Sequence, residues 1–238
     1  MRVLVVNDFH GQFRDKKTCK MLFNFIKREK PDKIILNGDV VDFYSISRFD
    51  KDAFRQWHLQ EEIDNVITLL NQLRKRTDVP MIYIEGNHEE RLRKYLRSNA
   101  RPLATLKALR IESLLKLKEL RIKYETDGIW LGDLFVYHGS LVRKDAGATA
   151  KAEREKNGCS GMSGHTHRDG TSPIRTRGGQ LCWWENFCMC DLNPDYVDGI
   201  ANWTQGFSVI TQTGGREYVE QIPIINGEMI YGGKLWKI

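Results

Sequence analysis

The chain opens with MRVLVVNDFHG, in which the apolar run at residues 2–7 leads directly into the polar residues Asp8 and His10. A short run rich in valine is typical of a strand that is buried on both faces, as in a parallel sheet. Two more runs of this kind, KIIL at 33–36 and MIYI at 81–84, are also followed by glycine and polar residues. The three segments are therefore predicted to be buried strands with polar turns at their carboxyl ends.

Helical patterns separate these strands. Apolar residues recur every three or four positions at 16–29 and at 51–76, which predicts two helices. Strands that alternate with helices indicate a parallel α/β sheet. Right-handed crossovers bring the turns after all three strands to one edge of such a sheet, where ligands bind.

The rest of the chain changes in character. Residues 90–98 and 103–120 have helical spacing, and we expect the second segment to pack a face of leucines on the core. Strand-like runs follow at 129–131, 134–137, 181–184, 207–210 and 218–222. The β-rich end, residues 171–238, is expected to complete a second sheet. No linker rich in proline, glycine or serine interrupts the chain, so residues 1–238 are predicted to form a single domain.

Composition narrows the class of protein. The chain has 238 residues, of which 41% are hydrophobic and 29% charged, a balance typical of a globular protein. No apolar run approaches the roughly 20 residues that cross a bilayer, which argues against a transmembrane helix and a membrane partner. The first apolar run is too short for a signal peptide, so we expect a cytoplasmic protein. The five cysteines lack the C-x2-C pair of a structural zinc site and are expected to be reduced, small buried residues.

Five of the six histidines lie in polar turns that follow predicted strands or in similar glycine-containing turns. These turns read D-F-H at 8–10, G-D-V-V-D at 38–42, G-N-H-E at 86–89, H-G at 138–139 and G-H-T-H at 164–167. Only His58 lies elsewhere, within a predicted helix. One histidine in a turn is usually structural, but five beside Asp and Asn point to a shared metal site.

The types of ligand atom indicate which metals would suit this site. Imidazole nitrogens combined with carboxylate and amide oxygens favour manganese, iron or zinc over magnesium or calcium. Two ions about 3.5–4 Å apart need a bridging ligand, which a carboxylate provides. A serine nucleophile at Ser140, close to His138, is excluded because no G-x-S-x-G elbow surrounds it.

In this order the motifs D-x-H, G-D-x-x-D, G-N-H-E, H and G-H-x-H resemble those of the calcineurin-like metallophosphoesterase superfamily, over residues 8–167. The resemblance implies a four-layer α/β/β/α sandwich and an enzyme that hydrolyses phosphoesters with two divalent metal ions. Manganese is the first expectation for these ions, with iron, zinc, nickel or cobalt as alternatives. The ions would generate a hydroxide that attacks phosphorus directly, and they would neutralise charge on the phosphoryl oxygens.

The resemblance also implies a role for each motif residue. One ion would be held by Asp8, His10, Asp39 and His167, and the other by Asp39, Asn87, His138 and His165, with Asp39 as the bridge. His88 would contact the phosphate or give a proton to the leaving oxygen, because imidazole titrates near pH 7. Asp42 would orient His88. Substrate contacts are expected from Asn87, His88 and Arg168, the arginine nearest the last histidine motif.

Two features bear on the substrate. Protein phosphatases of this superfamily carry an arginine after G-D-x-x-D and another before G-N-H-E, where this chain has Phe43 and Glu85. Arginine binds a phosphomonoester dianion with two hydrogen bonds, so its absence argues against a protein phosphatase. Residues 89–123 contain eleven Lys and Arg but four Asp and Glu, a net charge of +7 compared with +6 for the whole chain. A basic segment beside His88 favours a polyanion, although a solvated helix face has the same composition.

These features favour a phosphodiesterase, either a nuclease that acts on DNA or RNA or an enzyme that acts on a nucleotide. The alternative is a phosphomonoesterase with a small or protein substrate. A nucleic-acid-binding module with a purely structural metal site is less favoured, because such a module has no need for His88 and Asp42. The sequence does not indicate an oligomeric state.

Overall fold

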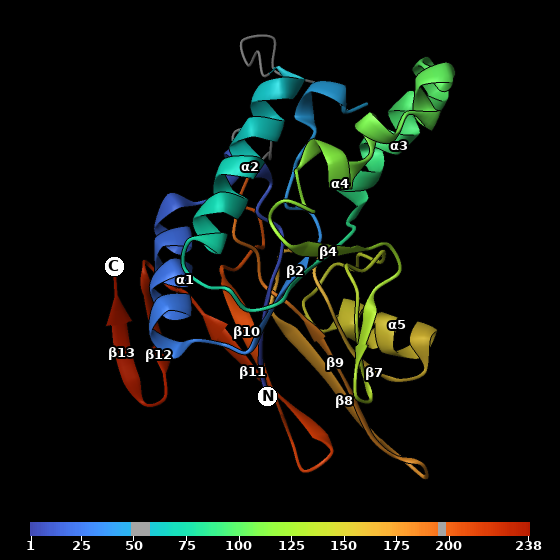
Figure 1. Ribbon diagram of the computed structural model, residues 1–238. Helices are drawn as coiled ribbons and strands as arrows, with labels where there is room; N and C mark the ends of the chain where they lie inside the picture. Colours follow the sequence, from blue (N-terminus) through green and yellow to red (C-terminus); the bar gives the residue numbers. More distant parts are fainter. Residues whose placement is uncertain (49–57, 195–198) are drawn as a thin grey trace.

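Two β-sheets packed face to face form the centre of the molecule, and helices cover their outer surfaces (Figure 1). This computed structural model describes residues 1–48, 58–194 and 199–238. The first sheet has the order β11-β10-β1-β2-β3-β4, with β1 (Arg2–Val6), β2 (Lys33–Asn37), β3 (Met81–Ile84), β4 (Ile122–Glu125), β10 (Gly206–Thr213) and β11 (Arg216–Pro223). The second has the order β5-β6-β7-β9-β8, with β5 (Ile129–Leu131), β6 (Leu134–Val136), β7 (Ser160–Ser163), β8 (Gly170–Thr176) and β9 (Gly179–Glu185).

The first sheet confirms the predicted parallel core. Strands β1, β2, β3 and β4 are parallel, with Val5 opposite Ile35 and Leu36 opposite Tyr83. The three predicted strands 2–7, 33–36 and 81–84 correspond to β1, β2 and β3. Their carboxyl ends therefore meet at one edge of the sheet, as the crossover rule requires.

Both faces of this sheet are buried. Alternate residues of β1 point to opposite faces. Leu4 and Val6 pack in the cluster formed with the helices, whereas Val3 and Val5 pack against the second sheet, and all four are fully buried. This two-sided burial explains why β1 reads as a continuous apolar run rather than an alternating one.

Helices complete the predicted four layers. α1 (Lys16–Glu29) and α2 (Leu59–Arg74) lie side by side over the outer face of the first sheet. α1 begins at Asp15, whose carboxylate accepts the N–H of Thr18 and caps the first turn. Its buried residues Leu22, Phe25 and Ile26 recur at helical spacing. α5 (Ala148–Asn157) packs on β7, β8 and β9 of the second sheet.

The prediction of a helix at 51–76 is confirmed for α2. Residues 51–57, with Phe54, lie outside the described residues. His58 is not inside the helix but caps its N-terminus, and its backbone N–H donates to the Glu61 carboxylate at 3.1 Å. None of the helices in the described ranges is both long and apolar enough to cross a membrane.

The prediction of a helix at 103–120 is wrong. After α3 (Asn87–Asn99), the chain forms the 3-10 turns η3 (Arg101–Thr105) and η4 (Lys107–Leu109) and the short helix α4 (Ile111–Leu114). Pro102 has no backbone N–H with which to continue α3, and Leu106 and Arg110 adopt extended backbone between the turns. Leu103 and Leu106 consequently remain exposed, whereas Ile111 and Leu115 pack on the core as expected.

The β-rich end does more than complete the second sheet, which corrects the expectation for residues 171–238. β8 and β9 extend the second sheet, but β10 and β11 join the first sheet as antiparallel strands beside β1. Phe207 and Val209 of β10 face the helices, and Ile210 faces the second sheet. The final hairpin, β12 (Glu228–Tyr231) and β13 (Lys234–Lys237), packs on α1 through Trp236 and Phe25.

Close packing inside the second sheet leads to a stability prediction. Gly161 on β7 lies where the indole ring of Trp183, on the neighbouring strand β9, occupies the space of a side chain. A methyl group at position 161 would collide with that ring and with the carbonyl oxygen of Phe135. We expect Gly161→Ala to lower the free energy of unfolding by about 1–3 kcal/mol, measured by urea denaturation.

The matched control is Gly178→Ala, whose added methyl group would lie 3.7 Å from its nearest neighbour, the hydroxyl of Thr176. This variant should change the free energy of unfolding by less than about 0.5 kcal/mol. Equal unfolding midpoints for the two variants would contradict the packing argument.

Candidate metal centre

Hydrogen bonds between two turns bring Asp8 and His10 beside Asp39. After β1, the backbone N–H groups of Asp8 and His10 donate to the carbonyl oxygens of Gly38 and Asp39, at 3.1 and 2.9 Å. β1 and β2 are adjacent and parallel, so the turns at their carboxyl ends run side by side and can pair in this way. Three predicted ligands therefore meet at the carboxyl edge of the first sheet.

The backbone of the predicted ligands is strained. Five of the seven have a φ between 50° and 70°, namely Asp8, His10, Asp39, His165 and His167. This left-handed region is uncommon for residues other than glycine. It persists only where the surrounding structure imposes it, and functional sites are the usual places. Of the ten described non-glycine residues with positive φ, five are therefore predicted ligands.

Asp8, His10 and His167 form the first part of the centre. The Nε2 atoms of the two histidines lie 3.0 Å apart. Oδ1 of Asp8 lies 3.3 Å from Nε2 of His167 and 3.8 Å from Nε2 of His10. That oxygen is buried and makes no hydrogen bond to any residue that the structure describes. A buried unpaired carboxylate oxygen beside two converging ring nitrogens is an arrangement that a bound cation would satisfy.

Asn87, His138 and Asp39 form the second part. Nε2 of His138 lies 3.1 Å from both Oδ1 of Asn87 and Oδ2 of Asp39. His165 joins Asp39 and His138 in a group whose potential ligand atoms all lie within 4.8 Å of one another. Asp39 also belongs to another such group, with His10 and His88. Asp39 therefore lies between the two parts of the centre, where a bridging carboxylate would have to be.

A buried carboxylate, Glu89, holds the turn of Asp39 in place. Its oxygens accept the backbone N–H groups of residues 39–41 and of Gly86, and the hydroxyl of Tyr83, at 2.5–3.2 Å. The motif analysis assigned Glu89 no role. Its place as the third residue of α3, where an acidic side chain commonly reaches back to the start of the helix, is the signal that could have identified it.

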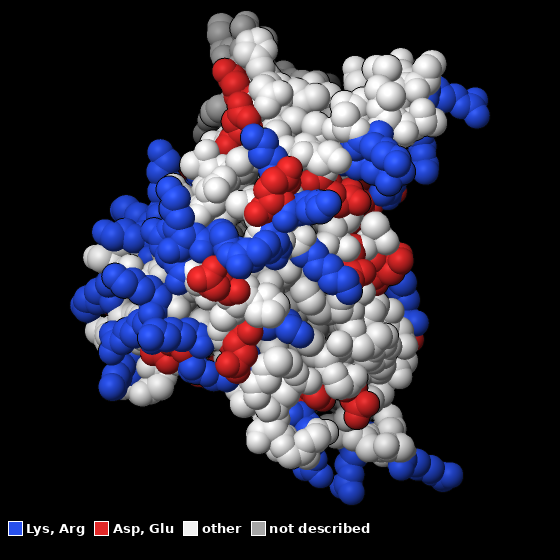
Figure 2. All heavy atoms as spheres, viewed as in Figure 1, with Lys and Arg blue, Asp and Glu red and all other residues white. Residues whose placement is uncertain are grey.

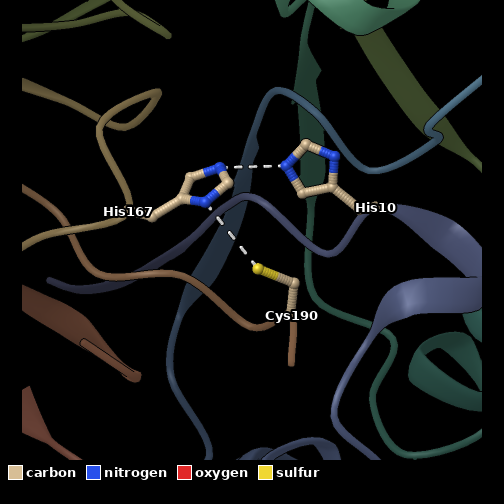
Figure 3. Close-up of side chains that lie close together, drawn as sticks. All are labelled: His10, His167 and Cys190. Carbon is tan, nitrogen blue, oxygen red and sulfur yellow. Dashed lines mark hydrogen bonds between the residues drawn. The ribbon is translucent and has the colours of Figure 1, made fainter. Parts of the chain in front are cut away.

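Figure 3 shows that His167 is held between His10 and Cys190. The ring turns Nε2 toward His10 and Nδ1 toward the Sγ atom of Cys190, at 3.8 Å. Imidazoles that ligate metals usually have a partner on the second ring nitrogen, and here that partner is a sulfur atom. Cys190 is buried as expected, but its contact with His167 was not predicted from the sequence.

His88 lies against Asp42 and Arg91. Nδ1 of His88 is 3.0 Å from the carbonyl oxygen of Asp42 and 3.3 Å from its carboxylate. The Asp42 carboxylate is also 2.9 Å from Nδ1 of His10, so Asp42 contacts both the candidate catalytic histidine and a candidate ligand. Nη2 of Arg91 is 2.9 Å from Nε2 of His88. Sequence reasoning counted Arg91 only within a basic segment, although its i+3 spacing from His88 on α3 indicates contact.

A cavity of about 380 Å³ lies at the centre. It is lined by His10, Asp42, His88 and Arg91, together with Tyr44, Ser47 and Trp203. The ring of Trp203 packs edge-on against His167, with 4.3 Å between centroids, and no sequence motif pointed to it. Arg168 is not among the lining residues. Its guanidinium donates to the carbonyl oxygens of Arg143 and Lys144, at 2.8 and 2.7 Å. In this arrangement Arg168 holds a neighbouring loop and does not face the cavity.

Charges within the centre are strongly coupled. Although burial opposes its charged form, the carboxylates of Asp39 and Asp8 raise the pKa of His138 to about 10. Burial lowers the pKa of His165 to about 4, and the neighbouring charge of His138 adds to this effect. Burial also opposes ionisation of Asp39, but His138 and His88 hold the pKa of that carboxyl well below its usual range. In the metal-free protein at neutral pH, a proton on His138 therefore provides the positive charge that Asp39 requires.

A family model described as calcineurin-like phosphoesterase matches residues 1–222. The chain belongs to this family. It is therefore a metal-dependent hydrolase of phosphoester bonds, and the fit of its residues supports this: the unpaired oxygen of Asp8 and the facing nitrogens of His10 and His167 suit a divalent ion. When bound, divalent ions would supply an activated water and neutralise charge at the phosphoryl group.

The chain is also similar in sequence or in fold to several known proteins. The Gene 54 protein of Mycobacterium phage L5 is 27% identical over 252 residues, which cover 100% of this chain and 99% of the phage protein. The fold is similar to that of Chaetomium thermophilum Vps29, with a TM-score of 0.52 and 9% identity over 95% of this chain and 92% of the other. The fold is also similar to that of a single mutant of Vps29 from Entamoeba histolytica, with a TM-score of 0.51. The sequence identity is 13%, over 100% of this chain and 98% of the other. At this identity the likeness to Vps29 concerns the fold alone.

Metal loading should release protons. At pH 7 His138 is protonated, because its pKa is raised to about 10, and Nε2 must lose that proton before it can bind an ion. We expect Mn²⁺ binding to the metal-free protein at pH 7 to release about one proton or more, measured by isothermal titration calorimetry in buffers of different ionisation enthalpy. The proton competes with the ion, so affinity should rise between about pH 6 and pH 9. A binding enthalpy independent of the buffer would contradict this expectation.

Loss of the Glu89 hydrogen bonds that hold the turn of Asp39 should weaken metal binding. Glu89→Ala leaves the N–H groups of residues 39–41 without their acceptor and frees the turn that carries Asp39. We expect the affinity for Mn²⁺ to fall by about 10- to 100-fold, measured by calorimetry, together with a lower melting temperature. The control is Glu90→Ala, which removes a half-exposed neighbour paired with Lys94 on the helix surface and should bind Mn²⁺ like the unmodified protein.

Proposed function

We propose that this phosphoesterase is a dinuclear phosphodiesterase that acts on nucleic acid or on a nucleotide. One ion would be held by Asp8, His10, Asp39 and His167, and the other by Asp39, Asn87, His138 and His165. Manganese remains the first candidate for both ions. The arrangement of ligand atoms around Asp39 supports this assignment, because Asp39 belongs to groups on both sides of the centre.

The shape of the cavity favours a phosphodiester over a phosphomonoester as the substrate. The central cavity continues across Ser47, Asn87, Arg91 and His165 into a second hollow of about 490 Å³ along α3. A phosphomonoester has one organic substituent on phosphorus, whereas a diester has two. Room beyond the centre for a second substituent therefore favours a diester substrate.

The two positions where phosphatases of this superfamily carry arginine support the same choice. Phe43 is fully buried, and the carboxylate of Glu85 accepts from Arg93 at 2.6 and 2.9 Å. Among the described residues that line the central cavity, Arg91 is the single arginine, and Asp42 and His88 share its guanidinium. One shared guanidinium suits a diester monoanion better than a monoester dianion.

His88 is the proposed proton donor. A guanidinium can only donate hydrogen bonds, so Nε2 of His88 accepts from Arg91 and its proton stays on Nδ1, toward Asp42. Phosphate oxygens of a bound substrate would attract the N–H groups of Arg91 and release Nε2. Burial opposes a charged His88, but the carboxylates of Asp39 and Asp42 raise its pKa, so Nε2 would then hold a proton for the leaving oxygen.

We also propose a reducing, cytoplasmic location. All five cysteines are free thiols, and Cys190 contacts His167 in the centre itself. Oxidation of Cys190 would replace a small thiol with a larger polar group in a fully packed place. A compartment that keeps thiols reduced suits this site.

The test compares two small substrates. Protein stripped of metal and reloaded with Mn²⁺ should hydrolyse bis-p-nitrophenyl phosphate with a higher kcat/KM than p-nitrophenyl phosphate. His88→Ala should lower kcat for the diester by about 10²- to 10⁴-fold through loss of the proton donor, with metal content unchanged. A preference for the monoester would support the phosphatase alternative instead.

The Asp42→Ala variant removes both contacts of the Asp42 carboxylate, one with His10 and one with His88. Because Asp42 touches His10 as well as His88, this variant should lose both turnover and Mn²⁺ affinity, measured by calorimetry beside His88→Ala. Asp133→Ala, at an exposed position after β5, serves as the control and should alter neither quantity. Full Mn²⁺ affinity in Asp42→Ala would show that its contact with His10 is unimportant.

A further inference from the structure

A row of polar side chains on α3 leads away from the metal centre. Residues at four-residue intervals share one face of a helix, and those three positions along lie beside them. On α3 this face carries Asn87, Arg91, Lys94, Tyr95, Ser98 and Asn99. The distance from the first of these to the last is about 18 Å along the helix axis. In Figure 1 this helix projects from the body of the molecule.

The hollow along α3 has the composition of a site for a polyanion. Arg48, Arg91 and Lys94 border it, and none of its described lining residues carries a carboxylate. The ammonium group of Lys94 pairs with Glu90 at 2.6 Å, but this pair lies on the surface, where such contacts are weak and exchange readily. Tyr95, 41% exposed, borders the same hollow. Proteins that bind single-stranded nucleic acids present exposed aromatic rings among cationic side chains, and the bases stack on these rings.

A second series of hollows begins at another edge of the centre. Trp203 lines both the central cavity and a neighbouring hollow of about 640 Å³. That hollow shares Lys17 with a further one of about 540 Å³, which Lys16, Lys20 and Lys237 also border. Asp15 and Asp169 line the first of these hollows, and Glu228, which pairs with Lys237 at 2.7 Å on the surface, lines the second. These four lysines are exposed. Figure 2 shows Lys and Arg gathered over α1 and the β12–β13 hairpin, so positive charge is not confined to the segment 89–123.

We propose that a single strand of nucleic acid binds along this path, with α3 on one side of the centre and α1 with the β12–β13 hairpin on the other. This inference rests on the proposed phosphodiesterase function and adds its substrate class. A mononucleotide would fill the central cavity and one neighbouring hollow, and would leave the remaining cations unused. A strand would engage the cations on both sides of the centre and gain affinity by releasing counterions. Tyr95 and Trp203 would stack on unpaired bases, which a duplex does not offer.

The experiment compares a polymer with a small diester in the Mn²⁺-loaded protein. The substrates are oligothymidylate and oligouridylate of about 12 nucleotides, and bis-p-nitrophenyl phosphate, which is far shorter than the proposed path. In Tyr95→Ala we expect the ratio of kcat/KM for the oligonucleotide to kcat/KM for the small diester to fall at least about fivefold. In Lys20→Ala and Lys94→Ala, the dependence of log kcat/KM on log salt for the oligonucleotide should weaken by about 0.7.

Matched controls exist for both kinds of variant. Tyr218→Ala removes another exposed tyrosine, on β11, with 55% of its surface accessible. Lys151→Ala removes another lysine that pairs with a glutamate four residues away, on α5. Both controls should keep the ratio and the salt dependence of the unmodified protein. Equal ratios in Tyr95→Ala and Tyr218→Ala, with equal salt dependence in all lysine variants, would overturn the inference.

The remaining outcomes separate this inference from the function on which it rests. If the unmodified protein cleaves the small diester but neither oligonucleotide, the inference is overturned and the phosphodiesterase proposal stands. If it cleaves none of the substrates, the phosphodiesterase proposal fails, and fluorescence anisotropy with labelled oligothymidylate tests the path directly. Binding that Tyr95→Ala weakens at least about fivefold would support the path. No binding, or equal binding in all variants, would overturn it.

Discussion

Two backbone hydrogen bonds, from Asp8 to Gly38 and from His10 to Asp39, join the turns that follow β1 and β2. They form only because the two strands are adjacent, parallel and held in register by their buried side chains. Glu89, in the first turn of α3, then accepts N–H groups of residues 39–41 and joins the start of α3 to the other two turns. Left-handed backbone costs of order 1–3 kcal/mol at each such residue, and this shared network together with the core beneath it offsets that cost.

The same network controls the charges of the centre. Asp8, Asp39 and Asp42 are almost completely buried, where an isolated carboxylate would be highly unfavourable. Histidines on neighbouring turns stabilise these carboxylates: His167 lies beside Asp8, His138 beside Asp39, and His10 beside Asp42. The pKa values of His167 and His138 are raised, so their protons balance Asp8 and Asp39 in the metal-free protein. Burial lowers the pKa of His10, which stabilises Asp42 through a hydrogen bond instead. Divalent ions would replace the protons with fixed charge, so the metal-free protein is already shaped for them.

In the proposed function, chemistry and substrate selection come from different parts of the chain. The predicted ligands lie on turns that follow strands of the two sheets. The proposed substrate path instead uses surfaces outside the sheets, namely one face of α3, the exposed face of α1 and the β12–β13 hairpin. Substitutions on these surfaces can change which diester reaches the centre without disturbing the buried network.

The sequence by itself determined the three central strands and the order of the turns, because buried strands and the polar residues that end them are local patterns. The predicted ligand set came from the resemblance of the motifs in those turns to a known family. It was wrong about 103–120, where leucine spacing outweighed Pro102, and about β10, whose apolar run suits either sheet equally. Only the tertiary structure decided that β10 pairs with β1, and that Cys190, Trp203 and Arg91 lie beside His167 and His88. The physical reason is that these contacts depend on how layers pack and which face of a helix turns inward, and residues distant along the chain jointly set both.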